Sequence, residues 1–103
     1  MLHVIGNTIG KLAGGIEDTP VLSCVKANLR RGNNIVIGIT TNDGLSTSAE
    51  NIGKLLNRKN YYFVPFRQDN PITKPNSLRM EDRYIKETLQ YALEGKQIQP
   101  LLL

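Results

Sequence analysis

The stretch NIVIGITTNDGLSTSAENIGKLL, from Asn34 to Leu56, decides the fold class that the sequence predicts. Its first part, Ile35 to Ile39, is an unbroken apolar run, which is typical of a strand covered on both faces of a parallel sheet. A polar turn follows, and beyond it Ile52, Leu55 and Leu56 recur at the spacing of one helix face. The stretch therefore predicts a buried strand, a turn and an amphipathic helix.

The residues around this helix extend the pattern into a βαβ unit. Thr47 and Glu50 have the spacing of a capping box, and we expect the helix to end near Asn57. A second strand, Tyr61 to Pro65, is expected to follow. A strand, a helix and a strand within about thirty residues predict two parallel strands joined by a right-handed crossover.

Two helices are predicted before this unit. The first starts at Asn7 and ends at Gly14 and Gly15. The second has Thr19 as its capping residue and Gly32 at its end, with a proline at the first helical position. Its inward face is expected to carry Val21, Leu22, Val25 and Leu29.

The remaining residues predict a loop, a helix and an extended tail. The loop, Phe66 to Pro75, contains two prolines and several Asp and Asn residues. The helix is expected to cover Asp82 to Glu94, with Gly95 closing it, and the apolar tail follows from Lys96. The inward face of this helix is expected to carry Tyr84, Ile85, Leu89, Ala92 and Leu93.

These elements predict one α/β domain over residues 1–103, with a partial flavodoxin-like or Rossmann-like three-layer α/β/α arrangement around a parallel sheet. The predicted strands are too few to complete such a sheet, because a fully buried strand needs neighbours on both edges. Either Leu2 to Ile5 add an edge strand, or the rest of the sheet belongs to another chain or to a missing half. A partial sheet of this kind favours a homo-oligomer.

Composition narrows the classes of function. The net charge is +4 and the pI about 9.4, but the basic residues form only two doublets, Arg30 with Arg31 and Arg58 with Lys59. Both doublets lie at expected helix ends, where cations are favoured, so nucleic-acid binding is not expected, whereas the phosphate of a small ligand remains open. One cysteine and one histidine exclude an internal disulfide and a zinc site of Cys and His ligands. No bilayer-spanning run or export signal is present, so we expect a cytoplasmic protein.

Two polar turns are candidates for a ligand site. The segment TTNDG, Thr40 to Gly44, leaves the buried strand at its carboxyl end, where open α/β sheets bind ligands. The segment GNT, Gly6 to Thr8, precedes the first helix and suits a phosphate or a flavin edge. Ordinary helix capping explains both turns as well.

The second turn lies at the start of a segment that resembles a known family. The segment NTIGKLAGGIEDTPV, Asn7 to Val21, resembles the segment of flavin-dependent decarboxylase-like flavoproteins that begins with the Asn-Thr of their Pro-Ala-Ser-Ala-Asn-Thr signature. Within that superfamily, STSAENIGKLLNRKNYYFVPFRQDNPITKPNSL and ALEGKQIQPLLL closely resemble the B-subunit family of dipicolinate synthase, the oxidoreductase that makes a spore metabolite. The residues that match the signature region are Asn7, Thr8, Lys11, Ala13, Gly15, Ile16 and Asp18.

This resemblance implies a cofactor and a partner. It implies FMN at the strand ends and a complex with a nicotinamide-using dipicolinate synthase A subunit. It also implies homo-oligomers, because members of the superfamily are commonly trimers or larger. Carried over to this chain, the family's flavin site consists of Gly6, Asn7, Thr8, Thr40, Thr41 and Asn42.

The sequence departs from the family in two respects. It resembles only the C-terminal half, so the loop that holds the flavin phosphate is missing, and His3, Val4 and Ile5 replace the start of the signature. We therefore expect FMN binding to be weak or absent in this chain alone. The alternative is a non-catalytic docking subunit that uses Leu101 to Leu103. A phosphopantothenoylcysteine decarboxylase is a weaker rival, because FVPFRQDNPITKPNSL matches the B-subunit family.

The other reactive residues favour structural roles, and no self-contained catalytic set is found. Cys24 is expected in the core and His3 at a frayed terminus. Asp43 and Asp69 are not expected to form an acid/base pair. The aromatic run of Tyr61, Tyr62 and Phe63 is expected in the core, Lys11 over the surface of its helix, and Phe66 and Arg67 near a ligand or a partner.

Overall fold

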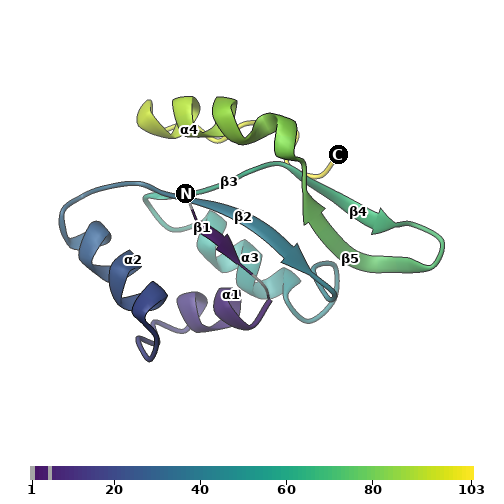
Figure 1. Cartoon of the computed structure of the whole chain (residues 1–103), viewed down its shortest axis with the longest axis horizontal. Helices are drawn as coiled ribbons and strands as arrows, with labels where there is room; N and C mark the ends of the chain where they lie inside the picture. The colour runs from purple at the N-terminus through teal and green to yellow at the C-terminus, as the bar shows by residue number, and fades with distance from the viewer. Residues whose placement is uncertain (1, 5) are drawn as a thin grey trace.

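A mixed sheet with helices on both faces forms the body of the protein (Figure 1). The computed structural model describes residues 2–4 and 6–103, the first three of them at the level of the backbone. Its central strand, β2 (Ile35–Thr41), contains the apolar run that the sequence singled out. The sheet order is β1-β2-β5-β4, and β3 pairs with β2 as well.

The parallel part of the sheet confirms the predicted βαβ unit. Helix α3 (Ala49–Leu56) connects β2 to β3 (Tyr61–Phe63), and the two strands are parallel, with Ile35 opposite Tyr61. Strand β1 (Leu2–Val4) pairs with the other edge of β2, also in parallel. The first residues therefore supply an edge strand, which was one of the two predicted solutions. Ile5 lies outside the described residues.

Two apolar clusters lie on opposite faces of β2 and confirm a three-layer arrangement. On one face, Ile35, Ile37 and Ile39 pack with buried residues of α1 (Gly6–Ala13), α2 (Pro20–Arg30) and α3. On the other face, Val36 packs with Ala92 of α4 (Ile85–Leu93). Figure 1 shows α4 alone on its side of the sheet, after the short helix η1 (Asp82–Tyr84).

The prediction of a wholly parallel sheet was wrong in one respect, because residues 66–80 form an antiparallel hairpin rather than a loop. Strand β4 (Phe66–Asn70) pairs with β5 (Lys74–Met80), and β5 pairs with the end of β2 through Thr40 and Thr41. Arg79 is the residue of β5 opposite Thr40. The sheet is therefore mixed.

A bulge explains how a strand accommodates Pro75, which led the sequence analysis to predict a loop. Gln68 is opposite Leu78 and Asn70 is opposite Lys74, so the register shifts between them and the intervening residues of β5 leave the regular ladder. Proline, which has no N–H to donate, is tolerated at such a bulge. The carbonyl of Pro75 accepts a bond of 2.9 Å from the side-chain amide of Gln68.

The helix ends follow the predicted capping residues, except at the starts of α1 and α3. Helix α1 begins at Gly6, so Asn7, which was expected to cap it, lies inside the helix. Thr19 caps α2 and accepts a bond from the N–H of Leu22, and Gly15, Gly32 and Gly95 adopt positive φ after their helices. The capping box at α3 was wrong. Ser48, not Thr47, occupies the N-cap position, and its side chain makes no capping bond because its hydroxyl donates into the preceding turn.

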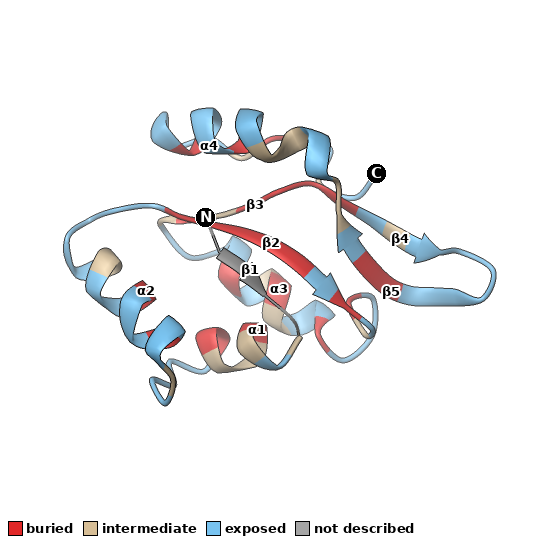
Figure 2. Cartoon of the chain, viewed as in Figure 1, coloured by how far each residue is buried: buried red, intermediate tan, exposed pale blue. Residues whose placement is uncertain are grey.

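Several predicted inward positions are at the surface (Figure 2). Val21 is 44% exposed and Leu93 is 86% exposed, because α2 and α4 each pack on the sheet through a narrower stripe than predicted. Cys24 is also exposed, so its predicted place in the core was wrong. Leu56 of α3 and Leu89 of α4 are also partly exposed, whereas Thr88, a polar residue, is fully buried and donates to the carbonyl of Tyr84.

The C-terminal tail is extended and lies against the sheet. The side-chain amide of Gln97 pairs with β3, since its oxygen accepts from the N–H of Phe63 at 2.7 Å and its nitrogen donates to the carbonyl of Phe63 at 2.6 Å. Further on, Leu102 forms a parallel bridge with Phe66, whose N–H donates to the carbonyl of Leu101 and whose carbonyl accepts from the N–H of Leu103. The aromatic residues of β3 are in the apolar clusters, as predicted.

Arg58 links two helices at the end of the sheet where β2 begins. Its guanidinium donates to the carbonyls of Leu12 and Ala13, which close α1. Cations at helix C-termini are favoured by the helix dipole. One of the basic residues that the sequence placed at a helix end therefore caps a helix, but a different helix from the one it follows.

Candidate functional site

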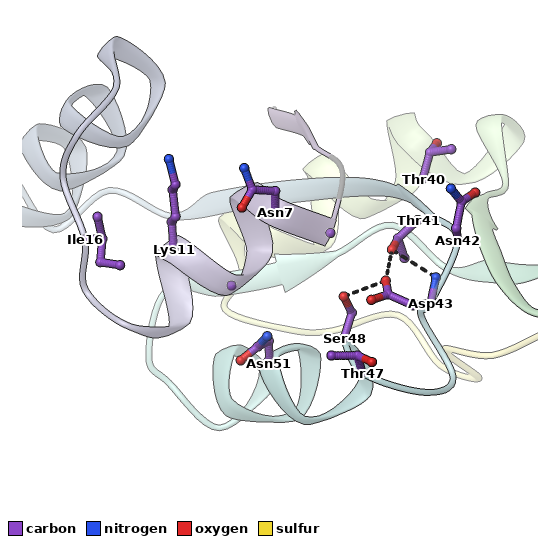
Figure 3. Close-up of a pocket in the computed structure, with 12 residues that line it drawn as sticks. Asn7, Lys11, Ile16, Thr40, Thr41, Asn42, Asp43, Thr47, Ser48 and Asn51 are labelled. Carbon is purple, nitrogen blue, oxygen red and sulfur yellow. Dashed lines mark hydrogen bonds between the residues drawn. The ribbon is translucent and has the colours of Figure 1, made fainter.

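A cleft of about 820 Å³ opens at the carboxyl end of β2, between the first turns of α1 and α3 (Figure 3). Both polar turns that the sequence selected contribute to it, although they are more than thirty residues apart. The cleft is lined by Gly6, Asn7, Gly10, Lys11, Ile16, Thr40, Thr41, Asn42, Asp43, Thr47, Ser48 and Asn51. The volume lies within the range of small-molecule sites.

Five of the six predicted site residues line this cleft, and Thr8 does not. The helical geometry of α1 explains the difference. Asn7, Gly10 and Lys11 are separated by three or four positions and share one face, whereas Thr8 is rotated away from that face. Thr8 therefore has a place beside the cleft rather than in its lining.

Asp43 holds the turn after β2 together. One of its carboxylate oxygens accepts bonds from the hydroxyl of Thr41 at 2.6 Å and from the hydroxyl of Ser48 at 2.8 Å. These two hydroxyl donors lower the pKa of Asp43 below its ordinary value of 3.8, the bond from Thr41 having the larger effect. Thr41 and Ser48 are themselves buried, so the cluster fixes the end of β2 to the start of α3.

Gly6 brings α1 against this cluster. A Cβ atom at Gly6 would lie 2.7 Å from the Thr41 hydroxyl and 2.9 Å from the Ser48 hydroxyl. Distances of this kind leave no room for a side chain. Gly44 is in a similar position, since a side chain there would collide with Leu78 of β5. The two candidate turns are thus packed directly on each other.

Lys11 forms an ion pair, whereas the sequence analysis expected its side chain only to lie over the surface of its helix. Its ammonium group lies 3.0 Å from both carboxylate oxygens of Asp18. Both residues belong to the segment that resembles the flavoprotein signature, and the ion pair ties the end of the α1–α2 connection back to α1. Within the lining of the cleft, Lys11 is the cation, and its charge is already matched by Asp18.

The chemistry of the lining suits a neutral polar group. Three amide side chains and the hydroxyls of threonine and serine surround one carboxylate and one paired lysine. Amides and hydroxyls can donate and accept hydrogen bonds to ring nitrogens, carbonyls and sugar hydroxyls. The carboxylate of Asp43 would repel a phosphate. Among the described residues, no group of three or more His, Cys, Asp or Glu is placed to hold a metal ion.

The sequence analysis missed Gly10, Ser48 and Asn51 as lining residues. A signal was available, because Thr47 and Ser48 directly precede a helix and Asn51 lies in its first turn, four and three positions further on, where such spacings share a face. What the sequence could not show is that α1 and α3 are adjacent, since this depends on tertiary packing.

The remaining candidates lie away from the cleft. Asp69 is in β4 and contacts Lys74 at 4.0 Å, so the structure provides no acid/base pair with Asp43. Phe66 is buried in the core, and Arg67 is paired with Glu81. The side chain of His3 lies outside the described part of the chain.

Comparison with known proteins finds chains with similar sequence and structure. No protein-family model matches the chain. Over 97 residues, 94% of its length, it is 41% identical to the B subunit of dipicolinate synthase from Bacillus subtilis (strain 168), of which it covers 48%. It also superposes over its full length on the crystal structure of the dipicolinate synthase B subunit from Bacillus halodurans, with a TM-score of 0.95 and 46% identity, covering 54% of that chain.

The chain is a homologue of the dipicolinate synthase B subunit. The resemblance that the sequence indicated is therefore confirmed, and the mixed sheet and its helices agree with the fold of that B-subunit structure. This B-subunit homologue spans about half the length of the relatives it matches. In the residues that the structure describes, no helix is both long and apolar enough to span a bilayer.

Proposed function

We propose that this chain corresponds to the C-terminal half of a B-type flavoprotein domain of dipicolinate synthase and forms the side of an FMN site that contacts the ring and the sugar chain. The observation that supports this role is the set of amide and hydroxyl side chains in the lining of the cleft at the end of β2. The flavin ring offers N–H and carbonyl groups, and its ribityl chain offers hydroxyls, all of which amide and hydroxyl side chains can bind. When bound, the flavin supplies electron-transfer chemistry.

Individual residues have different roles in this proposal. Asn7, Thr40 and Asn42 present amide and hydroxyl groups at the cleft and would contact the flavin (Figure 3). Thr41 is buried against Asp43, and Gly6 is packed on the same cluster, so these two residues position the site rather than bind its ligand. Thr8 would support the first turn of α1.

The phosphate of FMN would be bound by residues beyond this chain. The lining contains one carboxylate, and its lysine is already paired, so it offers no unmatched positive charge. A hydrogen bond to a charged group contributes about 1.5–3 kcal/mol, so the loss of two or three such contacts would reduce affinity by several orders of magnitude. Weak binding of FMN by this chain alone follows.

A comparison of FMN with riboflavin tests the proposal directly, because the two differ only in the phosphate. We expect this chain to quench the fluorescence of both with dissociation constants within about threefold of each other. Asn42→Ala should weaken both equally, while Gln90→Ala, an exposed change on α4, should weaken neither. Absence of binding by either ligand at millimolar protein would contradict a flavin role, and tighter binding of FMN by tenfold or more would contradict the assignment of the phosphate to other residues.

A role within a complex is the second part of the proposal. Homology to the B subunit supports a nicotinamide-using A subunit as partner, and the chain would act in the synthesis of dipicolinic acid only as part of that oxidoreductase. The alternative, a docking subunit without flavin, is favoured by Leu102 and Leu103, which are 47% and 42% exposed at the end of the tail. Sedimentation of the chain mixed with an A subunit separates the cases, because docking without flavin predicts a complex in which flavin fluorescence is unquenched.

A further inference from the structure

Three residues form a row across the sheet, from the cleft to the outer strand. Thr40 of β2 is opposite Arg79 of β5, and Arg79 is in turn opposite Arg67 of β4. Residues directly opposite each other on antiparallel strands point to the same face, with Cβ atoms about 4.5–5.5 Å apart. Thr40 also belongs to the lining of the cleft (Figure 3). The row therefore places one arginine beside the cleft and a second arginine beside the first.

This row lies on the open face of the β4–β5 hairpin. Side chains alternate between the two faces of a strand, so Thr40 points to the opposite side from Thr41, as Figure 3 shows. On β5 the same alternation separates Arg79 from Leu78, which is buried in the cluster that α1, α2 and α3 cover. Arg67 and Arg79 are exposed. Both arginines are therefore accessible to a ligand that reaches over the end of β2.

The positive charge of Arg79 is not matched within the chain. The carboxylate of Glu81 lies 3.5 Å from Nε of Arg67 and 3.9 Å from Nε of Arg83. Among the residues that the structure describes, no ion pair includes Arg79. Like charges directly opposite each other on neighbouring strands are unfavourable, so an anion bound at Arg79 would relieve its repulsion with Arg67. This corner of the sheet has three guanidinium groups and one carboxylate near them, and it remains positive.

The inner side of the cleft repels an anion. The carboxylate of Asp43 accepts bonds from the hydroxyls of Thr41 and Ser48, and these three residues lie on the other side of β2 from Thr40 (Figure 3). A negative group at the end of β2 is therefore repelled by Asp43 and attracted by Arg79. The two charges orient any ligand that has an uncharged end and an anionic end, with the anionic end over β5.

We infer that Arg79, with Arg67 beside it, binds the carboxylate of a small acid whose uncharged part lies in the cleft. A guanidinium offers parallel N–H donors that match the two oxygens of a carboxylate. The inference rests on the proposed function, because dipicolinic acid, which the name of the homologous subunit contains, is a pyridine with two carboxylic acid groups. Both groups flank the ring nitrogen, so the opposite edge of the ring is uncharged and suits the amide and hydroxyl lining.

Calorimetric titration with dipicolinate tests the role of Arg79. We expect Arg79→Gln to weaken binding about tenfold or more, and Arg79→Lys, which keeps the charge but not the parallel donors, to weaken it less. Lys59→Gln is the matched control, because it removes the same charge from an exposed residue near the start of β3, at the other end of the sheet. The uncharged diamide of dipicolinic acid should bind the chain and Arg79→Gln equally. Riboflavin affinity should be the same in every variant, which shows that the fold and the cleft are intact.

The outcomes separate this inference from the proposed function. If riboflavin binds but dipicolinate does not, or binds Arg79→Gln as tightly as Lys59→Gln, the carboxylate site is wrong and the flavin role stands. If dipicolinate binding depends on Arg79 and riboflavin does not bind, the flavin role fails and the carboxylate site stands.

Phosphate is the competing oxyanion. Tighter binding of pyrophosphate than of dipicolinate, lost in Arg79→Gln, would assign the arginines to the phosphates of a nucleotide and overturn the inference. A loss of FMN binding in Arg79→Gln without a loss of riboflavin binding would overturn it as well, because the arginines would then hold the flavin phosphate.

Discussion

Gly6 shows how a single residue without a side chain joins the two parts of the cleft. The sequence analysis assigned this glycine to a ligand site, whereas in the structure the hydroxyls of Thr41 and Ser48 lie within 3 Å of where its Cβ would be. That difference could not be predicted, because it depends on the packing of α1 on a turn more than thirty residues away.

Substitution of Gly6 by alanine should therefore destabilise the fold. We expect Gly6→Ala to reduce the free energy of unfolding by about 1–3 kcal/mol, as overpacking usually does. Gly10→Ala is the matched control in the same helix, since its Cβ would contact only the Asn51 amide at 3.5 Å, and alanine favours helix. Urea unfolding of both variants measures this, and equal stabilities would show that the cluster has room for a methyl group.

Asp43 makes the stability of the chain depend on pH. Its pKa in the folded chain is below the ordinary value of 3.8 because two hydroxyls donate to its charged form. A lowered pKa contributes stability above pH 3.8 and loses that contribution as the pH falls through the folded pKa. Asp43→Asn removes the charged acceptor, and should cost about 1–3 kcal/mol at pH 6.

Urea unfolding between pH 2 and pH 6, each value about one unit apart, measures this dependence. The difference in stability between the chain and Asp43→Asn should be full at the upper end and should shrink below the ordinary pKa of 3.8. Asp69→Asn is the control, because its contact with Lys74 at 4.0 Å on the β4–β5 hairpin contributes about 0–1 kcal/mol. A difference that did not change with pH would contradict a role for the Asp43 charge.

Among the secondary-structure elements, those with a regular apolar period were the ones that the sequence predicted well. The continuous apolar run of β2 and the capping residues of α2 gave both elements within two residues. The β4–β5 hairpin was missed because its outer half is polar on both faces and contains Pro75, so neither alternation nor apolar character marks it. A bulge and an Asn70 turn supply what the pattern lacks.

The side chain of Gln97 takes the place of a neighbouring strand beside β3, which no sequence pattern indicates. Its amide pairs with the N–H and carbonyl of Phe63, as a neighbouring strand would. Gln97→Ala would leave both backbone groups without these partners, and should cost about 2–4 kcal/mol. Hydrogen exchange at the Phe63 amide, followed by NMR, should accelerate in this variant, whereas Gln99→Ala, an exposed neighbour, should leave it unchanged. Retained protection in Gln97→Ala would mean that another group covers β3.

The assembled fold confirmed the α/β class and the three layers, because these follow from which faces of β2 are apolar. The cleft was also anticipated from the rule that ligands bind at the carboxyl ends of parallel strands. The mixed character of the sheet was not anticipated, since it depends on a polar hairpin that pairs with the last two residues of β2. The sequence therefore predicted the elements of the proposed site more completely than the contacts between them.

The edges of the sheet differ in whether they can pair with a further strand. The Gln97 amide pairs with β3, and Leu101 to Leu103 pair with the base of β4, so added strands are blocked at these two places. In the part of the chain that the structure describes, β1 pairs only with β2, which leaves its other edge to accept a strand. The parallel part of the sheet therefore keeps one edge, that of β1, open to a further strand. A further strand beside β1 would extend the parallel part of the sheet on that side.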